Sequence, residues 1–195
     1  MLYKIAILIL YPIFMLLYRV KVTGKENLTD GAAVLCANHS SLLDPVLIAI
    51  GLTAKYPLNF MAKKELFKNR VFGGIISALG AFPVDRDSAD LGTIRKSIEV
   101  LKGGGKLLLF PEGRRVRDGH LDCNDVKTGV AMIAMRANVP IIPIYLSGNK
   151  KIFRKTVLSI GKPIIPEKRE GTSSENYKRI ATEAFRAICA MEESK

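Results

Sequence analysis

Residues 32–45 read AAVLCANHSSLLDP, and this stretch decides the fold class. Its first six residues are apolar and uncharged, as in a strand that is buried on both faces of a sheet. The polar residues that follow end the strand. Pro45 suits the first position of a helix, with Asp44 before it as the N-cap. The stretch therefore predicts a strand, a polar loop and a helix over residues 45–52, which together open an α/β unit.

The rest of the chain repeats this alternation of strand and helix. Further strands are expected at residues 57–62, 81–85, 106–110, 140–146 and 157–160. Helices are expected at residues 63–79, with an interruption near Gly73 and Gly74, and at 90–102, 125–137 and 173–193. The pattern predicts an α/β fold: a mixed, largely parallel sheet flanked by helices. Residues 21–195 are expected to form this one domain, with a polar connection at 21–31.

Residues 1–20 are expected to form a separate N-terminal helix. Residues 5–18 carry no charge, but 14 residues are fewer than the about 20 that a membrane span needs. Tyr side chains and the following Arg19 and Lys21 suit lipid head groups. We interpret the segment as an interfacial membrane anchor that lies in one leaflet. A helix buried in the core and a true span remain open as alternatives.

The composition favours an anionic partner. The 195 residues include 30 Lys and Arg against 18 Asp and Glu, for a net charge of +12, and 48% are apolar, which excludes wholesale disorder. A basic surface attracts nucleic acid, anionic lipid head groups or small phosphorylated substrates. Basic runs such as residues 150–155 would face nucleic acid or an anionic membrane equally well.

The three cysteines form no C-x-x-C pair. They stand at Cys36, Cys123 and Cys189, and their number is odd. The pattern disfavours a disulfide framework or a zinc site and fits a reducing, cytosolic setting.

Polar clusters follow three of the expected strands. They comprise residues 38–44, residues 85–86 and residues 111–115. Because ligands of open α/β sheets bind beyond the carboxyl ends of the strands, we expect these clusters to form one site.

His39 and Asp44 are the candidate catalytic pair. They are five residues apart, and Asp44 precedes Pro45, which biases it away from helical geometry and allows the loop to curl. An Asp that accepts from one imidazole nitrogen leaves the other nitrogen to take a proton from a hydroxyl. With no G-x-S-x-G nucleophile elbow, the hydroxyl is expected to belong to a bound acceptor. The alternative makes Asp44 a plain N-cap and His39 an ordinary loop residue.

Arginines in the other clusters are candidates for binding phosphate. Arg86 and Arg115 offer planar guanidinium groups that match phosphate oxygens, although either can equally be solvated surface. Glu112 is expected to orient an arginine or hold an acceptor hydroxyl, or simply to form an ion pair with Arg114 or Arg115.

Taken together, these segments resemble the lysophosphatidic acid acyltransferase family. That family carries N-H-x-x-x-x-D, G-x-[IF]-[FP]-[VI]-x-R, F-P-E-G-[TS]-R-S and V-P-[IV]-[IV]-P-[VI] in this order. The chain shows NHSSLLD at 38–44, GAFPVDR at 80–86, FPEGRRV at 110–116 and VPIIPI at 139–144. Each motif alone is weak, but four in order are a specific signal.

The resemblance implies a role for each residue of the site. His39 would be the general base and Asp44 would orient it. Glu112, Arg86 and Arg115 would bind the glycerol phosphate head group, with Gly113 allowing close approach of the backbone. Residues 140–144 would shape the acyl and core side of the pocket. The resemblance implies neither a metal nor a cofactor.

The expected function is therefore a membrane-associated acyltransferase of phospholipid biosynthesis. It would move a fatty acyl group from acyl-CoA or acyl-carrier protein to 1-acyl-glycerol-3-phosphate, giving phosphatidic acid without a covalent enzyme intermediate. The expected location is peripheral or monotopic, on the cytoplasmic face of the cell membrane. Arg114 and Val116 replace hydroxyl residues of the family motif, so a different lysolipid acceptor is the first alternative. A non-catalytic lipid-binding protein and, on charge alone, a nucleic-acid binder are the others.

Overall fold

A computed structural model describes residues 1–84, 91–116, 121–123, 125–147 and 150–194. Its strands form one sheet in the order β1-β7-β6-β2-β5-β3-β4. All neighbouring strands run parallel except β6 and β7. The strands are β1 (Lys21–Thr23), β2 (Ala33–Ala37), β3 (Leu58–Lys63), β4 (Ala81–Val84), β5 (Lys106–Leu109), β6 (Ile141–Leu146) and β7 (Val157–Ile160). The predicted mixed, largely parallel sheet is confirmed.

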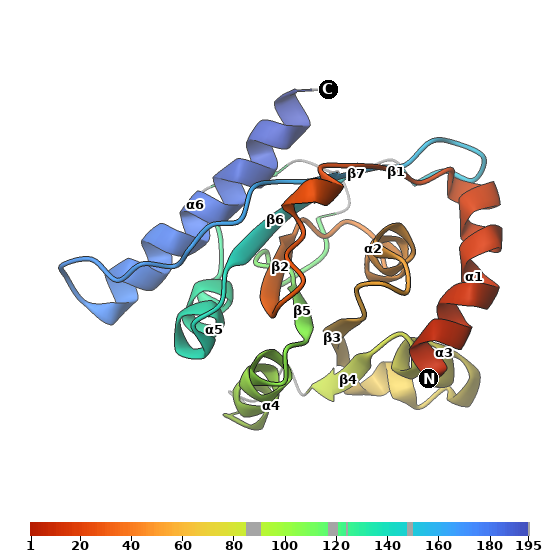
Figure 1. The fold of residues 1–195 in the computed structure, drawn as a ribbon, viewed down its shortest axis with the longest axis horizontal. Helices are drawn as coiled ribbons and strands as arrows, with labels where there is room; N and C mark the ends of the chain where they lie inside the picture. Colours follow the sequence, from red (N-terminus) through yellow and green to blue (C-terminus); the bar gives the residue numbers. More distant parts are fainter. Residues whose placement is uncertain (85–90, 117–120, 124, 148–149, 195) are drawn as a thin grey trace.

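Helices cover both faces of this sheet (Figure 1). They are α1 (Leu2–Tyr18), α2 (Asp44–Leu52), α3 (Arg70–Ala78), α4 (Leu91–Lys102), α5 (Gly129–Ala137) and α6 (Ser173–Glu193), with short 3-10 helices η1 (Lys25–Asn27) and η2 (Lys64–Phe67). Helices α1, α2 and α3 pack on one face, and α4, α5 and α6 pack on the other. The sheet therefore has two separate apolar cores.

Strand β2 lies at the centre of the sheet and contributes to both cores. Ala33, Leu35 and Ala37 pack on the side of α2, whereas Val34 and Cys36 pack on the side of α5 and α6. All five residues are fully buried, because β5 and β6 flank the strand and helices cover it from both sides. The expectation of a strand buried on both faces is confirmed.

Three boundaries differ from the expected ones. Strand β1 lies in the segment expected to be a connection and pairs with β7 at the edge of the sheet. The helix expected at 63–79 is divided into η2 and α3, and the break falls at Asn69, whose side chain caps α3, not at the glycines. Gly73 lies inside α3, where a Cβ would meet the Phe67 backbone at 3.0 Å, so the glycine lets α3 approach η2. Helix α5 begins at Gly129, not at residue 125.

Helix α1 has one packed face and one exposed face. Ile7 and Tyr18 are buried against α2 and α3, whereas Leu8 and Leu16 are 76% and 68% exposed. The packed face agrees with the core-helix interpretation, and the interfacial anchor stays a prediction for the exposed face. In the described part of the chain, no helix has the length and hydrophobicity needed to cross a bilayer.

The sequence pattern disfavoured disulfide bonds, and this prediction was wrong for one pair of cysteines. Cys123 and Cys189 form a disulfide, with Cα atoms 6.5 Å apart, between the segment before α5 and helix α6. Only Cys36, buried in β2, is free. The two bonded residues are 66 positions apart, so their meeting depends on how α6 packs and leaves no local spacing signal.

Candidate active site

Two loops meet at the carboxyl end of the sheet because their strands are parallel neighbours. Cys36 of β2 is in register with Leu109 of β5, so the loops that follow both strands leave the sheet side by side. The Val116 amide donates to the His39 carbonyl at 2.8 Å and fastens one loop to the other. The sheet therefore brings together the first and third polar clusters of the sequence.

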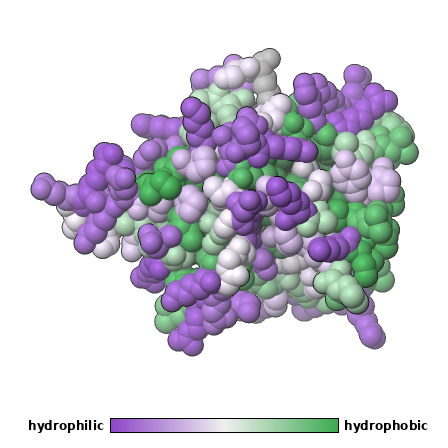
Figure 2. Space-filling model, viewed as in Figure 1, coloured by the Kyte–Doolittle hydropathy of each residue, from purple (hydrophilic) through white to green (hydrophobic). Residues whose placement is uncertain are grey.

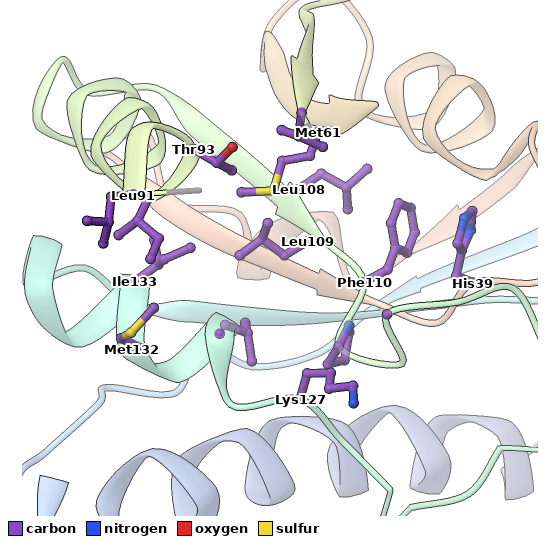
Figure 3. Close-up of a pocket in the computed structure, with 16 residues that line it drawn as sticks. His39, Met61, Leu91, Thr93, Leu108, Leu109, Phe110, Lys127, Met132 and Ile133 are labelled. Carbon is purple, nitrogen blue, oxygen red and sulfur yellow. The ribbon is translucent and has the colours of Figure 1, made fainter. Parts of the chain in front are cut away.

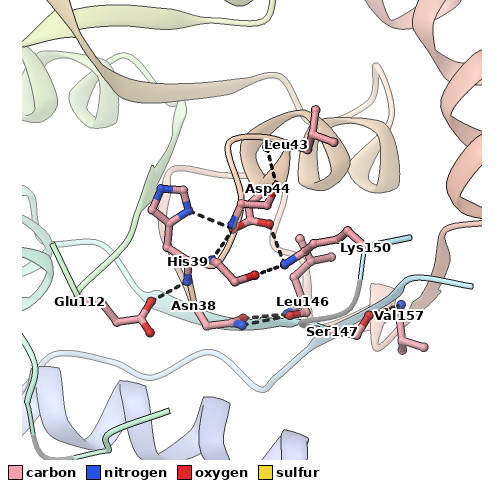
Figure 4. A network of polar contacts seen from close by, with 11 residues as sticks. Asn38, His39, Leu43, Asp44, Glu112, Leu146, Ser147, Lys150 and Val157 are labelled. Atoms are coloured by element: carbon pink, nitrogen blue, oxygen red, sulfur yellow. Dashed lines mark hydrogen bonds and ion pairs between the residues drawn. The ribbon is translucent and has the colours of Figure 1, made fainter. Parts of the chain in front are cut away.

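The predicted contact between His39 and Asp44 is present. His39 Nδ1 lies 2.9 Å from Asp44 Oδ2, and the same oxygen accepts from the amides of Ser40 and Ser41 at 2.7 and 2.8 Å (Figure 4). Asp44 is fully buried and is itself the first residue of α2; the N-cap is Leu43, one residue earlier than expected. With Nδ1 facing the carboxylate, Nε2 is the ring nitrogen left to accept a proton.

Lys150 completes this cluster from the other side of the carboxylate. Its Nζ lies 2.8 Å from Asp44 Oδ1 and also contacts Ser40 Oγ, and its side chain is 4% exposed. Sequence reasoning placed Lys150 in a basic run facing a polyanion, and this was wrong for that residue. Burial alone would raise the pKa of Asp44, but the hydrogen bond with His39 and the charge of Lys150 hold that pKa below its usual value.

Asn38 fixes the position of the loop after β2. Its side-chain amide donates to the Leu146 carbonyl at 2.9 Å, and its carbonyl oxygen accepts from the Leu146 amide at 2.8 Å. Through the Asn38 side chain, these two hydrogen bonds continue the pairing of β2 with β6 beyond the end of β2. They hold His39, the next residue, at the end of the sheet. The sequence analysis gave Asn38 no role of its own.

Glu112 contacts the backbone of His39. Its Oε2 accepts from the His39 amide at 2.5 Å, and among the described residues no ion pair joins it to an arginine. Burial raises the pKa of the Glu112 carboxyl to about 7, despite the opposing hydrogen bond from His39. The other oxygen, Oε1, is buried and has no hydrogen-bond partner in the described part of the chain. Glu112 therefore links the loop after β5 to the loop after β2, and its second oxygen is a buried acceptor that no described residue uses.

The imidazole of His39 lies between two apolar cavities. The first, of about 470 Å³, extends from His39 towards α4 and α5, and Figure 3 shows Leu91, Met132 and Ile133 at the end away from the imidazole. The second, of about 150 Å³, lies towards α2 and α3. Phe110 lines both and stacks on His39 with ring centroids 4.1 Å apart. One nitrogen base is thus reachable from two sides.

The remaining predicted site residues are distributed around these cavities. Arg115 is exposed and lines the second cavity with His39, whereas Gly113 lines the first with a φ of +67°, a conformation that favours glycine. Arg86 lies outside the described residues; Val84, in the strand before it, lines the first cavity. Residues 140–144 do not line either cavity on the acyl side; they lie in and just before β6, whose residues are all buried in the core.

Comparisons with known proteins show the family of this chain. A family model described as Acyltransferase matches residues 19–147. The 1-acyl-sn-glycerol-3-phosphate acyltransferase of Bacillus subtilis is 34% identical over 151 residues, which cover 74% of this chain and 73% of the relative. The enzyme of that name from Streptococcus pneumoniae is 43% identical over 127 residues, covering 65% of this chain and 46% of the relative.

A solved structure shows the same fold. The crystal structure of the 1-acyl-sn-glycerophosphate (LPA) acyltransferase from Thermotoga maritima matches with a TM-score of 0.71 at 26% identity, covering 97% of this chain and 78% of that one. The family match contains the loops after β2 and β5 but ends before Lys150.

Proposed function

This chain belongs to the acyltransferase family, and from that premise we propose that it acylates the free hydroxyl of 1-acyl-glycerol-3-phosphate to give phosphatidic acid. The single observation that carries the proposal is the His39–Asp44 pair, 2.9 Å apart, between two apolar cavities. The names of the relatives supply the acceptor.

The pair suits direct acyl transfer. His39 Nε2 removes the proton of the acceptor hydroxyl, and the oxygen attacks the thioester carbonyl of the donor. The tetrahedral intermediate collapses, the carbon–sulfur bond breaks, and the thiolate takes the proton from the imidazolium. Asp44 stabilises the imidazolium while it exists, so a contribution of about 10²–10⁴-fold from the base is reasonable.

We assign one cavity to each of the two substrates, both of which carry an acyl chain. The larger is lined mainly by apolar side chains and falls within the about 300–1,000 Å³ of small-molecule sites, so we assign it to the acyl chain of the donor. The smaller has Arg115 and Lys63 among its lining residues, so we assign it to the acceptor. His39 lines both and would meet the hydroxyl where the thioester also arrives.

The head group of the acceptor would be held by charge. We propose that Arg115, which lines the smaller cavity, binds the phosphate, and Arg86 stays a prediction for the same role. Because its pKa is about 7, Glu112 is partly protonated near neutral pH, which lessens its repulsion of a phosphate. The donor would be acyl-CoA or acyl-carrier protein, both anionic and thus complementary to a chain of net charge +12.

The exposed face of α1 supports membrane association. Figure 2 shows hydrophobic side chains gathered on the side of the molecule where α1 lies. The large exposed ones on this helix are Leu2, Ile5, Leu8, Ile9, Tyr11, Ile13 and Leu16. Apolar side chains near Arg19 and Lys21 match the boundary between acyl chains and anionic head groups. We place this face on the cytoplasmic surface of the cell membrane.

A panel of lysolipid acceptors tests the proposal. Purified protein is given an acyl thioester and, separately, lysophosphatidic acid or a lysolipid with a different head group. We expect transfer to the phosphate acceptor, and we expect R115A to raise its KM about 10- to 150-fold while the KM of the donor changes little. If the protein acylates only a lysolipid with a different head group, the alternative acceptor is favoured. The exposed Arg114, which replaces a hydroxyl residue of the family motif, is the reason for considering that alternative.

A further inference from the structure

Lys150 is a buried cation that the proposed chemistry does not yet use. Its Nζ lies 2.8 Å from Asp44 Oδ1, with side chains 4% and 0% exposed. A buried ion pair requires both partners, because either charge left alone is strongly destabilising. The other oxygen of the same carboxylate faces His39, so one Asp is shared between the Lys150 ammonium and the His39 imidazole.

We propose that Lys150 is a positioning residue of the His39–Asp44 pair: it fixes the carboxylate that faces Nδ1, and its charge opposes a second positive charge on the imidazole. The inference deepens the proposed function and rests on His39 being the base. The carboxylate is held at Oδ1 by Lys150 and at Oδ2 by the amides of Ser40 and Ser41, so its orientation towards Nδ1 does not depend on His39 alone.

The electrostatic consequence has a definite sign. A cation beside Asp44 repels an imidazolium at His39, so removing the cation stabilises the protonated imidazole. The other charged groups around His39 are Asp44 from α2, Glu112 and Arg115 from the loop after β5, Lys127 before α5 and Lys63 from β3. In the described part of the chain, Lys150 forms an ion pair with Asp44, whereas Arg115, Lys127 and Lys63 do not.

The first test needs no substrate. The chain contains two histidines, so H120Q leaves His39 as the single imidazole in a proton NMR titration of the full-length protein. In this background, K150M and K150Q should move the titration midpoint of His39 upward by about one pH unit. The matched control is K151M, which removes the same charge from the exposed neighbouring residue and should leave the midpoint unchanged. K150R, which keeps the charge, should also leave it near the wild-type value.

The second test is kinetic. For K150M and K150Q, the acidic limb of the pH–rate profile should move upward with the NMR midpoint. Their kcat should fall about 10- to 100-fold because the base is less well positioned, while KM changes little. Thermal unfolding identifies any variant that does not fold, and K150Q keeps a hydrogen-bond donor for Asp44 in case K150M is too disruptive.

The outcomes separate this inference from the proposed function. An unchanged His39 midpoint in both folded variants, or an equal shift in K151M, would overturn the role of Lys150 even if the wild type is active. If the midpoint shifts in K150M and K150Q but the wild type transfers no acyl group, the electrostatic role is supported and the proposed reaction is refuted.

Discussion

Burial raises the pKa of the Glu112 carboxyl to about 7, well above the about 4.3 of a glutamate in an unfolded chain. A raised pKa means that the folded protein binds the proton more tightly than the unfolded chain does. The resulting stability is present in full below about pH 4.3 and is lost as the pH rises through 7. E112Q carries no titrating group, so its melting temperature should fall less than that of the wild type between pH 5 and 8. Parallel melting curves over this range would contradict the assignment.

Asp44 is expected to matter for both stability and rate. D44N leaves the ammonium of Lys150 buried without its counter-charge, which should lower the free energy of unfolding by about 3–5 kcal/mol. The double variant D44N/K150M removes both charges and should recover much of that loss in urea unfolding. It should not recover activity, because His39 still lacks the carboxylate. Recovery of both would mean that Asp44 acts only through the fold.

For single residues, the sequence predicts contacts between side chains that are close along the chain. It misses contacts between segments that only the folded sheet brings together. The spacing of His39 and Asp44 before Pro45 is enough to expect a curled loop with the two side chains in contact, as observed. Lys150 reaches Asp44 from the segment between β6 and β7, and Glu112 contacts a backbone amide instead of an arginine. Neither contact has a local signal, because each depends on which strands become neighbours.

Among the elements, α1 packs one face on the core and exposes an apolar face, to which we assign membrane binding. We expect L8Q and L16Q to weaken sedimentation with anionic liposomes, because each removes an exposed apolar side chain from the outer face. I165Q alters a residue that is 64% exposed away from α1 and serves as the matched control. Both α1 variants should melt near the wild-type temperature; sedimentation equal to that of I165Q would refute membrane binding by this face.

The elements that could be predicted best carry their own boundary signals. Helix α6 spans 173–193, as expected, and its start is fixed locally by a capping box between Thr172 and Glu175. Strand β1 has three residues and no apolar run, and it forms because β7 offers an edge to pair with. Helix α5 begins four residues later than its composition suggests. Such features are decided by tertiary contacts that override local propensity.

At the scale of the whole molecule, the larger cavity should limit the length of the acyl chain that the donor can carry. Ile133 lies at the end of the larger cavity away from His39 (Figure 3). If that cavity holds the acyl chain of the donor, I133F shortens it and should lower kcat/KM for long acyl donors more than for short ones. An equal loss for all lengths, with a lowered melting temperature, would indicate overpacking of the core alone.

The proposed function depends most on one step: during direct acyl transfer, His39 takes the proton of the acceptor hydroxyl at a point between the two cavities. The measurement that tests it most directly follows thiol release and lipid product together, with an acyl thioester and lysophosphatidic acid, for the wild type and H39A. We expect the wild type to form phosphatidic acid and free thiol in equal amounts, and H39A to be folded yet slower by about 10²–10⁴-fold. Near-normal turnover by folded H39A, or thiol release without acylated lipid, would contradict the account.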